Sequence, residues 1–557
     1  MQFRWNHTQG APDYDRETGF GFVTGAVYNA DAGLHIPETN SGFLPLWWYA
    51  GTPIFDIRQS EYGLQATAAE ALRTEDAADR RLPVWLRIQV PGEGVYRAEI
   101  TVTGTDGGEV LVFTGRRRLA WRGVLPAGAQ QIVTAYCDVF PIVPRGQADA
   151  VASDAVNIAV VGGALSAVAL AEAPHTRRIW VCGDSTVTDQ TGELPYAPGT
   201  SYAGWGQMLP AYLPEVCITN HAHSGLTTES FLSEGHWAIV KPRLRAGDIC
   251  LFQFGHNDQK LAHLQARGGY TDRLRTYIKE TLTAGAVPVL ITPLARNSWR
   301  DPTHYNDFLA DFADAVLDLG KEEAVPVLDL HAYAMQLIRQ EGLETAKRWF
   351  YPGDYTHTND FGAYRMAGFV AGALGKAVGL PVADSPAWTP APPFAPLTPP
   401  KDCALPAPDT DPFADYDATR PQEVLTRAEA LELAIKALKL FPINVYNDLY
   451  ADIVGHETYA GTVQCAAQND LIPAAWVADG RLYPQRTVTA ADFLAVLMPG
   501  AAGRRPLAAP SSLPDSVPAY ARFAAGQAVA EQLLSADSLN DPITRSDAAA
   551  LCRRLHI

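Results

Sequence analysis

The chain lacks a long hydrophobic segment, a cysteine framework and a basic region, and each absence excludes a class of protein. The longest apolar run, residues 158–171, is shorter than the roughly 20 residues that a membrane helix needs. Seven cysteines are scattered without Cys-x-x-Cys spacing, which argues against a disulfide scaffold or a cysteine-based metal site. The net charge is −17 and no segment is basic, which argues against a nucleic-acid partner.

The N-terminal residues also lack the apolar stretch of a secretory signal, since none follows Arg4. We therefore expect a cytoplasmic protein with no membrane partner, the alternative being a cell-surface protein whose signal peptide has been removed. What the chain does contain is apolar material for several cores, because 47% of its 557 residues are hydrophobic and 19% are charged. A domain usually has about 100–200 residues, so three or four domains are expected.

Two different patterns of hydrophobic residues divide the first two thirds of the chain into two regions. Residues 1–173 contain short alternating runs, such as 84–90, separated by Gly, Pro and Asp, which predicts an all-β sandwich. Gly162-Gly163 predicts a hairpin turn between two strands of this region. In residues 176–382 apolar strands alternate with helical patterns, which predicts a parallel sheet with helices on both faces. The expected strands are 179–182, 249–254, 287–292 and 325–328, and the expected helices are 271–283, 304–319, 331–346 and 360–378.

The last part of the chain consists of a linker and a helical region. Eleven prolines between 381 and 412 predict a stiff, extended linker at 383–412. Residues 413–557 are rich in Ala and Leu and contain three similar boxes, which begin at Thr426, Thr489 and Thr544. A Thr at the N-cap with an acid three residues later is a capping box, and its recurrence predicts a helical repeat.

The strand at 179–182 leads directly into Gly183-Asp184-Ser185-Thr186. Glycine permits a tight turn at the carboxyl end of a parallel strand, where open α/β sheets place their active sites. Ser185 is then expected at the start of a helix, where backbone N–H groups point at an incoming oxyanion. The triplet Gly-Asp-Ser is common in ordinary turns, so the interpretation of Ser185 as a nucleophile depends on partners elsewhere in the chain.

Three further segments supply such partners. Gly225 suits a backbone N–H donor close to substrate, and Asn257 offers an amide donor in a loop after a strand. Asp354 precedes His357 by three residues, so its carboxylate can accept the Nδ1–H and leave Nε2 free to take a serine proton. Serine needs this base because its hydroxyl is a poor nucleophile at neutral pH. We predict Ser185, His357 and Asp354 as the catalytic set, with an oxyanion hole formed by Ser185, Gly225 and Asn257.

These four blocks, in this order, resemble those of the SGNH/GDSL hydrolases. The spellings Gly-Asp-Ser-Thr at 183–186, Gln-Phe-Gly-His-Asn-Asp-Gln-Lys at 253–260 and Asp-Tyr-Thr-His-Thr at 354–358 are similar to the rhamnogalacturonan acetylesterase branch, carbohydrate esterase family twelve. The resemblance covers only the central domain. It implies a flavodoxin-like α/β/α sandwich, ester hydrolysis without a metal or other cofactor, and the same roles for the serine, the histidine and the aspartate.

Other polar residues near these blocks have secondary roles in this interpretation. Asp184 is predicted to cap the turn beside the serine, and Asp258 to brace the loop of Asn257. His256 and Arg296 are candidates for lining the substrate groove.

Two clusters have plainer interpretations than their composition suggests. His221 and His223 form a His-x-His pair, but no carboxylate cluster nearby in the sequence completes a metal site, and no metal is expected. Arg116-Arg-Arg118 is interpreted as a solvated strand or loop face rather than a phosphate-binding patch.

The flanking regions resemble accessory modules. The N-terminal region is similar to the galactose-binding, jelly-roll modules of carbohydrate enzymes, in which aromatic residues either stack on sugars or fill the core. The C-terminal region resembles S-layer homology repeats, whose box arginine helps to bind anionic wall polymers. Ala490 replaces that arginine in the middle repeat, so this region either binds a wall polymer or is a structural or dimerising unit. The aromatic candidates in the N-terminal region are Trp47, Trp48, Tyr49, Trp85 and Trp121.

The predicted function is removal of acetyl groups from a pectic or other plant polysaccharide or its oligosaccharides, with rhamnogalacturonan favoured. One alternative is an acetylxylan esterase, or a thioesterase or lipase-like enzyme of the same superfamily. Another is a protein that binds wall glycans without catalysis. Because the chain is acidic, binding of a polyuronate requires a local positive patch, for which Arg296 is the candidate. The sequence leaves the oligomeric state open, a homo-oligomer included.

Overall fold

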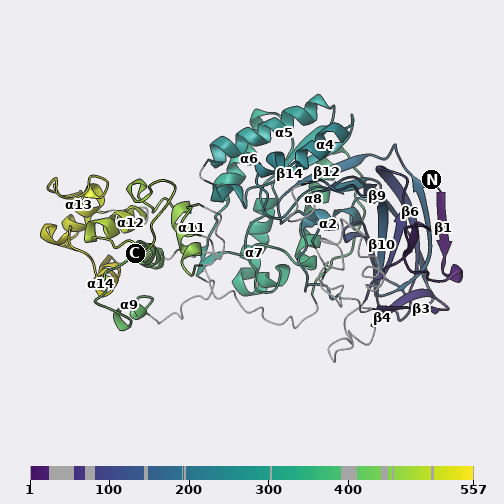
Figure 1. The fold of residues 1–557 in the computed structure, drawn as a ribbon, viewed down its shortest axis with the longest axis horizontal. Coiled ribbons are helices and arrows are strands. Elements are labelled where there is room, and N and C mark those ends of the chain that lie inside the picture. Colours follow the sequence, from purple (N-terminus) through teal and green to yellow (C-terminus); the bar gives the residue numbers. More distant parts are fainter. Residues whose placement is uncertain are drawn as a thin grey trace. The chain divides into compact units, whose positions relative to one another are not determined.

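The computed structural model forms two compact units (Figure 1). The first contains Met1–Asp258, Gln265–Asn297 and Asp307–Thr398, and the second contains the rest. Trp47, Trp48 and Tyr49 lie outside the described residues. The structure describes residues 2–23, 55–68, 82–143, 149–190, 192, 196–261, 263–301, 304–390, 411–438, 440, 449–453, 457–502 and 507–555.

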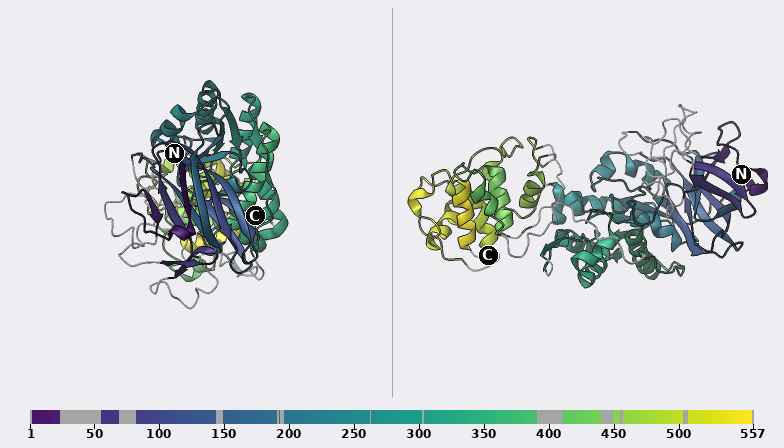
Figure 2. Two further views of the ribbon diagram at one scale, coloured as in Figure 1. Left: turned by 90° about the vertical axis from the view of Figure 1, so that its right-hand side faces the viewer. Right: turned by 90° about the horizontal axis from the view of Figure 1, so that it is seen from below.

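The N-terminal part of the first unit is a sandwich of two antiparallel sheets, whose strands run side by side in Figure 2 (left). In the first sheet the order is β3-β4-β11-β6-β9, with β1 also paired to β11, and in the second it is β2-β5-β10-β7-β8. The strands of the first sheet are β1 (Gln2–Asn6), β3 (Phe55–Ser60), β4 (Gly63–Ala68), β6 (Gly94–Thr103), β9 (Gln130–Val139) and β11 (Ala164–Glu172). Those of the second are β2 (Phe20–Phe22), β5 (Val84–Gln89), β7 (Glu109–Thr114), β8 (Arg118–Val124) and β10 (Ala155–Val161).

Alternation of buried and half-buried residues creates the sandwich core, because successive side chains of a strand point to opposite faces. Ile100 and Val102 of β6 and Val112 of β7 are fully buried between the sheets. Gly162-Gly163 does form a turn, but it joins β10 in one sheet to β11 in the other, so the predicted hairpin is wrong. The sequence marks the turn through its glycines, but it carries no local signal for the sheet in which the next strand pairs.

The central part of the first unit contains a parallel sheet in the order β13-β12-β14-β15-β18. In Figure 1, α4, α5 and α6 lie on one side of this sheet, and α2, α7 and α8 on the other. The predicted parallel α/β domain is therefore confirmed. The strands are β12 (Arg178–Gly183), β13 (Cys217–Asn220), β14 (Ile249–Gln253), β15 (Val287–Ile291) and β18 (Val327–Leu328). The helices are α2 (Trp205–Met208), α3 (Ser230–Ser233), α4 (His236–Val240), α5 (Thr271–Thr283), α6 (Ala310–Glu322), α7 (Leu330–Ala346) and α8 (Asp360–Val378).

The order of this sheet reverses at β12, because the chain passes first to β13 on one side and then to β14 on the other. Ligands bind open α/β sheets at such a switch point, in the crevice beyond the carboxyl ends of the strands. The Ser185, Gly225 and Asn257 loops follow β12, β13 and β14 respectively, so the topology brings them to one place.

The first residues of the predicted linker belong to the first unit. Trp388 is buried and its ring packs against Phe361 and Tyr364 at centroid distances of 5.1 and 5.5 Å. The guanidinium of Arg122 also lies over the Trp388 ring. The proline content predicts that this segment is part of a linker, but the packing of Trp388 fixes it to the first unit. Residues 391–410, which contain most of the prolines, lie outside the described part of the chain.

The C-terminal part of the second unit is helical, and its helices cluster together in Figure 2 (right). All three predicted boxes begin helices, and the Thr426 side chain exchanges hydrogen bonds with Glu429 in a complete capping box. The helices of this part are α9 (Ala414–Ala418), α10 (Arg427–Ala437), α11 (Ala460–Gln468), α12 (Ala490–Ala502), α13 (Arg522–Ala530) and α14 (Arg545–Leu555). The second unit also includes the two-stranded hairpin of β16 (Trp299–Asp301) and β17 (His304–Tyr305).

Backbone hydrogen bonds join the three boxes into a closed ring. Leu425 N–H donates to the carbonyl of Ile543 over 2.9 Å, Ile543 N–H to Val488 over 3.3 Å, and Val488 N–H to Leu425 over 3.0 Å. A second set of backbone hydrogen bonds flanks the first and joins the same three copies in the opposite direction, from Arg427 N–H to Arg486, from Ala490 N–H to Asp541 and from Arg545 N–H to Glu423. The predicted internal repeat is thus a pseudo-threefold arrangement.

The box arginines of the first and third repeats are buried and make contacts within the second unit. Arg427 is buried, and its guanidinium donates to the carbonyls of Trp476 and Leu482, at 2.6 Å each. Arg545 is also buried and pairs with Glu429. Both side chains bind the protein itself, which is the opposite of what a polymer-binding arginine requires.

Candidate active site

Ser185 stands on a tight turn immediately after β12. A side chain in place of Gly183 would bring its Cβ to 2.6 Å from the carbonyl of Gln253 on the neighbouring strand, so only glycine fits. Asp184 is fully buried, and its Oδ1 accepts hydrogen bonds from the N–H and hydroxyl of Thr186 at 2.9 and 2.8 Å. As predicted, Asp184 caps the turn and leaves the serine side chain at the edge of the sheet.

His357 brings an imidazole to this serine from a loop 172 residues further on. Its Nε2 lies 2.8 Å from Ser185 Oγ, and its Nδ1 lies 2.8 Å from Asp354 Oδ2. Asp354 Oδ1 accepts two more hydrogen bonds, from the N–H groups of Thr356 (2.6 Å) and His357 (3.0 Å). A carboxylate that accepts the Nδ1–H fixes the tautomer in which Nε2 faces the serine as an acceptor.

The charge of Asp354 is stabilised despite its partial burial. Burial raises the pKa of this carboxyl, but the hydrogen bond and charge of His357, with the two backbone N–H groups, outweigh burial and lower it below the usual value. Asp354 therefore stays ionised at neutral pH. It can hold the imidazole in place and stabilise the imidazolium that forms when His357 takes a proton.

A hydrogen bond joins two of the three loops that form the predicted oxyanion hole. The Nδ2 of Asn257 donates to the carbonyl of Leu226, beside Gly225, over 2.9 Å. Gly225 has a φ of +89°, and no atom lies within 4 Å of the position that a Cβ would occupy there. Within the described part of the chain, the backbone N–H groups of Ser185 and Gly225 have no protein acceptor. These groups suit donation to a substrate oxygen, while the topology of the sheet brings their loops together.

Comparison with known proteins gives this geometry a family. A family model described as "GDSL-like Lipase/Acylhydrolase family" matches residues 181–365. The chain is 33% identical over 222 residues to a rhamnogalacturonan acetylesterase of Bacillus subtilis (strain 168), a match that covers 37% of this chain and 93% of that protein. The chain belongs to the GDSL-like lipase/acylhydrolase family. It is a serine esterase of the acetylesterase group.

Two further comparisons accompany this match, and the first of them covers more of the chain. This GDSL hydrolase is 25% identical over 368 residues to an uncharacterised esterase of Bacillus subtilis (strain 168), covering 64% of this chain and 82% of that protein. Among solved structures it is similar to an acetylxylan esterase from Geobacillus stearothermophilus, with 18% identity and a TM-score of 0.28, over 37% of this chain and 94% of that one.

Asp258 holds the Asn257 loop of the hydrolase from inside. Its Oδ1 accepts the N–H and hydroxyl of Thr228 at 2.8 and 2.6 Å, and its Oδ2 accepts the N–H of Gly255 at 3.1 Å. The side chain is fully buried, which raises the pKa of its carboxyl to about 7 although the hydrogen bonds from Thr228 oppose the rise. This placement agrees with the predicted bracing role.

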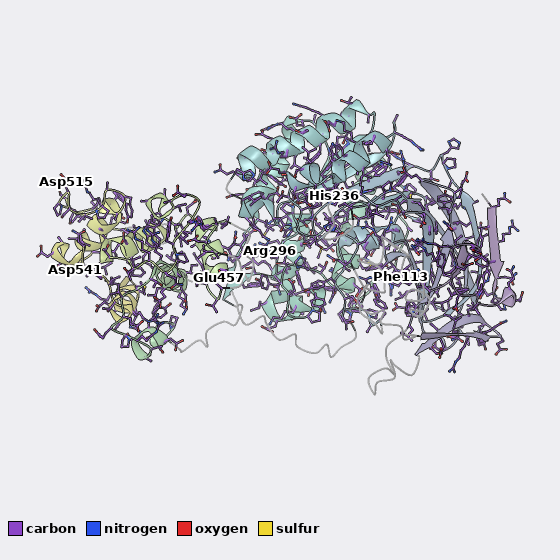
Figure 3. The ribbon with its side chains drawn as sticks, viewed as in Figure 1. Phe113, His236, Arg296, Glu457, Asp515 and Asp541 are labelled. Carbon is purple, nitrogen blue, oxygen red and sulfur yellow. The ribbon has the colours of Figure 1, made fainter. Side chains whose placement is uncertain are left out.

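His256 and Arg296 are not placed as lining residues of an open groove. His256 is 2% exposed, with Nδ1 3.2 Å from Asp184 Oδ2 and Nε2 2.8 Å from the carbonyl of Leu294. The pKa of His256 lies below its usual value, mainly because the side chain is buried. The charge of Arg296 adds to this lowering, and the charge of Asp184 opposes it. Arg296, labelled in Figure 3, is 3% exposed and provides no exposed positive patch. His256 supports the serine turn from within through Asp184, and both side chains are buried, so the groove assignment is corrected.

The two histidines of the His-x-His pair have separate surroundings. His221 is buried with its ring 5.4 Å from that of Trp180, whereas the His223 ring lies 5.4 Å from that of His236. In the described residues, no group of three or more His, Cys, Asp or Glu side chains is arranged to hold a metal ion. None of the described helices is both long and apolar enough to span a bilayer.

Three residues beside the predicted catalytic groups were missed by the sequence analysis. Tyr202 presents its ring edge to His357 at a centroid distance of 5.7 Å and stacks on Tyr351 at 3.6 Å. Gln190 donates from Nε2 to the carbonyl of Ser185 over 2.9 Å. None of these residues stands in a recognisable motif, and only the folded chain brings them to the site.

Proposed function

We propose that the protein is a carbohydrate O-acetylesterase that releases acetate from acetylated plant polysaccharides or their oligosaccharides, with a rhamnogalacturonan-type substrate favoured. The observation that carries the proposal is the continuous hydrogen-bonded series from Ser185 Oγ through His357 to Asp354. The named relatives, rhamnogalacturonan acetylesterases of Bacillus subtilis and Emericella nidulans, support the choice of acyl group and substrate.

Acylation begins when Ser185 Oγ attacks the acetyl carbonyl carbon and its proton passes to His357 Nε2. The carbonyl oxygen becomes an oxyanion, which accepts hydrogen bonds from the N–H groups of Ser185 and Gly225 and from the Asn257 amide. Asp354 stabilises the positive charge on the imidazole. The tetrahedral intermediate then collapses as the C–O bond to the sugar breaks and His357 gives its proton to the departing sugar oxygen. The serine is left as an acetyl ester.

Deacylation follows the same path with water as the nucleophile. His357 Nε2 removes a proton from water, and the oxygen attacks the acetyl carbon. The second tetrahedral intermediate collapses, acetate leaves, and Ser185 Oγ recovers its proton from His357. The atoms balance as one ester plus one water giving one alcohol and one acetic acid.

The surroundings of His357 favour a sugar over a long acyl chain. The stacked rings of Tyr202 and Tyr351 form an aromatic surface directly beside the imidazole, and both residues are partly exposed. Aromatic faces with polar tips suit the mixed apolar and hydroxyl surface of a pyranose. The buried placement of Arg296 removes the positive patch proposed for a polyuronate, so local stacking and hydrogen bonds carry recognition in this proposal.

Replacement of Ser185 tests the proposal. Ser185→Ala is expected to abolish acetate release from acetylated rhamnogalacturonan oligosaccharides, because no other group takes the acetyl. Ser535→Ala, the same change at an exposed serine of the second unit, serves as a matched control and should turn over normally. Acetate release by Ser185→Ala at the rate of the control would end the assignment.

A panel of substrates then tests the acyl group and the sugar. Acetate release is measured on acetylated rhamnogalacturonan, homogalacturonan, xylan and mannan oligosaccharides, and p-nitrophenyl acetate is compared with the octanoate. The proposal expects rhamnogalacturonan first and acetate well above octanoate. Preference for xylan would move the substrate assignment to acetylxylan, and preference for octanoate would indicate a lipase-like enzyme instead.

A further inference from the structure

The turn between β7 and β8 of the sandwich reaches into the hydrolase domain of the same unit. It contains Arg116 and Arg117 and is followed by Arg118, all three of which are buried, at 6%, 1% and 6% exposure. The predicted solvated face is therefore wrong. Phe113 at the end of β7, labelled in Figure 3, packs edge-on against Tyr196 of the hydrolase domain at 5.7 Å.

The outer two arginines anchor this turn. Arg116 Nε lies 3.1 Å from Asp189 Oδ2, and Arg118 Nε lies 3.3 Å from the same oxygen. Arg118 also pairs with Asp138 of β9 at 2.5 Å. Asp189 in turn accepts from the Asn220 amide at the end of β13 over 2.9 Å. These pairs hold the tip of the sandwich against the loop that follows the Ser185 turn.

The guanidinium of Arg117 then contacts three segments of the hydrolase domain. Nε donates to the carbonyl of Gln190 over 3.1 Å, Nη1 to Asp360 Oδ1 over 2.7 Å, and Nη2 to the carbonyl of Tyr202 over 2.5 Å. The side chains of Arg117 and Asp360 are both fully buried. Arg117 itself has a φ of +63°, an unfavourable conformation for a residue with a Cβ, which the surrounding contacts maintain.

One of these segments continues to the serine. The Nε2 of Gln190 donates to the carbonyl of Ser185 at 2.9 Å and also lies 3.4 Å from Ser224 Oγ, beside Gly225. Arg117 holds the main chain of Gln190, so the side chain of Gln190 is directed at the nucleophile and at one loop of the oxyanion hole.

The other two segments continue to the base. Asp360 is the first residue of α8, three residues after His357, and it also accepts from Tyr196 and from the N–H of Gly199, at 2.9 Å each. Tyr202 pairs as an isolated bridge with Asn359, and its ring contacts the imidazole of His357. Arg117 therefore holds both the start of α8 and the segment of Tyr202, which are the two segments beside the base.

We propose that Arg117 is a positioning residue, which sets the distance between Ser185 and His357 by holding both of their loops from the sandwich. The inference rests on the proposed function, because it assigns Arg117 to the Ser-His-Asp chemistry. It makes the N-terminal domain a part of the catalytic apparatus, whether or not that domain also binds sugar. A displacement of about 1 Å between reacting groups costs on the order of 100-fold in rate, so a side chain that holds both loops has a large effect without touching substrate.

The matched control for this arginine is Arg87. It is also fully buried in the sandwich and pairs with an aspartate, Asp154, at 2.6 Å, while donating to Asn157 and lying over Tyr14. These contacts all lie within the sandwich. A purely structural role for Arg117 predicts the same outcome for both arginines, whereas a positioning role predicts a difference in turnover per folded molecule.

The test compares Arg117→Lys with Arg87→Lys in the full chain, using p-nitrophenyl acetate because this small ester makes few contacts that change KM. Lysine keeps the charge but loses the planar set of donors that reach three segments. For Arg117→Lys we expect kcat per folded molecule to fall about 10- to 100-fold, with KM within about twofold. The rate at which a fluorophosphonate probe labels Ser185 should fall in parallel. Arg87→Lys should keep the wild-type kcat. Wild-type kcat in folded Arg117→Lys, or an equal fall in Arg87→Lys, would overturn the inference.

Gln190→Met keeps the test usable if Arg117→Lys does not fold. Arg117 binds the main-chain carbonyl of Gln190, so this variant removes only the side-chain link to Ser185. We expect kcat to fall about tenfold with KM little changed, and an unchanged kcat would overturn the serine half of the inference. Ser185→Ala separates the two proposals: if it is inactive and both positioning variants turn over normally, only this inference fails. If Ser185→Ala is active, the proposed function itself fails.

Discussion

In the first unit, Arg117 connects the sandwich to the loops of Ser185 and His357, whereas in the second unit Arg427 and Arg545 connect copies of one repeat. The same physical device is used in both places, a buried guanidinium that donates to main-chain carbonyls. In the second unit two rings of backbone hydrogen bonds join the same repeats as well, and the middle repeat does without the arginine. One contact of a repeated set can be lost while the others remain. Arg116 and Arg118 also hold the turn of the sandwich against the hydrolase domain, but among the contacts described above only Arg117 reaches the segments beside both Ser185 and His357. The predictions below test this difference.

The largest difference is expected from a change that affects chemistry alone. Asp354→Asn keeps the size of the side chain but removes the charge that fixes the His357 tautomer, and acetate release is expected to fall on the order of 10⁴-fold. Asp547→Asn makes the same change at the capping box of α14 in the second unit, and it should leave acetate release unchanged. Far-UV circular dichroism verifies that both variants are folded. A fall of less than tenfold in Asp354→Asn would contradict the assigned role.

The next largest effect concerns buried charge. Asp360→Asn removes the negative charge that pairs with the fully buried guanidinium of Arg117 and leaves it with neutral partners. Breaking such a buried pair costs about 3–5 kcal/mol. Glu429→Gln weakens the pair with Arg545 in the second unit, where the carboxylate is 19% exposed, and a smaller loss of unfolding free energy is expected. Urea unfolding measures both. Equal losses would mean that the Arg117–Asp360 pair and the Arg545–Glu429 pair contribute equally to stability.

The contributions of two carboxyl groups, one in each unit, are expected to respond to pH with opposite signs. Burial raises the pKa of Asp258 to about 7, so between about pH 4 and 7 the folded chain retains a proton that the unfolded chain releases. The contribution of Asp258 to the stability of the first unit should therefore be lost as pH rises through this window, and this loss should be absent in Asp258→Asn. In the second unit the hydrogen bond from Arg553 lowers the pKa of Asp411. The stabilisation that this carboxylate provides is therefore present above about pH 4 and is lost as the pH falls through the lowered pKa of Asp411. Urea unfolding of wild type and Asp258→Asn from pH 4 to 8 measures the first effect. Parallel curves for these two proteins would contradict it.

The smallest expected effect tests the equivalence of the repeats. Thr426→Ala and Thr489→Ala each remove the hydroxyl that caps a helix, at about 1 kcal/mol of unfolding free energy. Since the two caps are equivalent in the pseudo-threefold arrangement, the losses should agree within about 0.5 kcal/mol. Acetate release should not change in either variant. A cost confined to one cap would show that the repeats are not energetically equivalent.

Features encoded by local sequence were predictable from the chain alone. The alternation of strands and helices between 176 and 382 determines the parallel sheet, and α5 and α8 have the bounds that periodicity indicates. The Asp354-x-x-His357 spacing is short enough for the carboxylate to reach Nδ1 within one loop, and the structure shows this contact. Ser185 and His357 then meet because both follow structural elements whose ends converge at one edge of the sheet.

Features that depend on distant partners were not predictable. Three consecutive arginines are typical of a solvated surface, and their burial requires Asp189 and Asp360, which lie up to 243 residues away. His256 looks like a groove residue because it adjoins Asn257, but its partner Asp184 lies 72 residues earlier. Trp388 likewise anchors a proline-rich segment through rings that no local pattern connects to it. In each case the local sequence does not show which buried charged group or aromatic ring the side chain will contact in the folded chain.

The hydrogen-bonded ring of the second unit restricts how that region can change. An open array of repeats can lose or gain a copy at its end, since each copy contacts only its neighbours. Here Leu425 of the first copy donates to Ile543 of the last, so the array has no free end. Removal of the last copy would leave unpaired backbone groups on both remaining copies. Three is therefore a fixed number for this geometry, and the region can evolve by substitution within copies but not by changing their number.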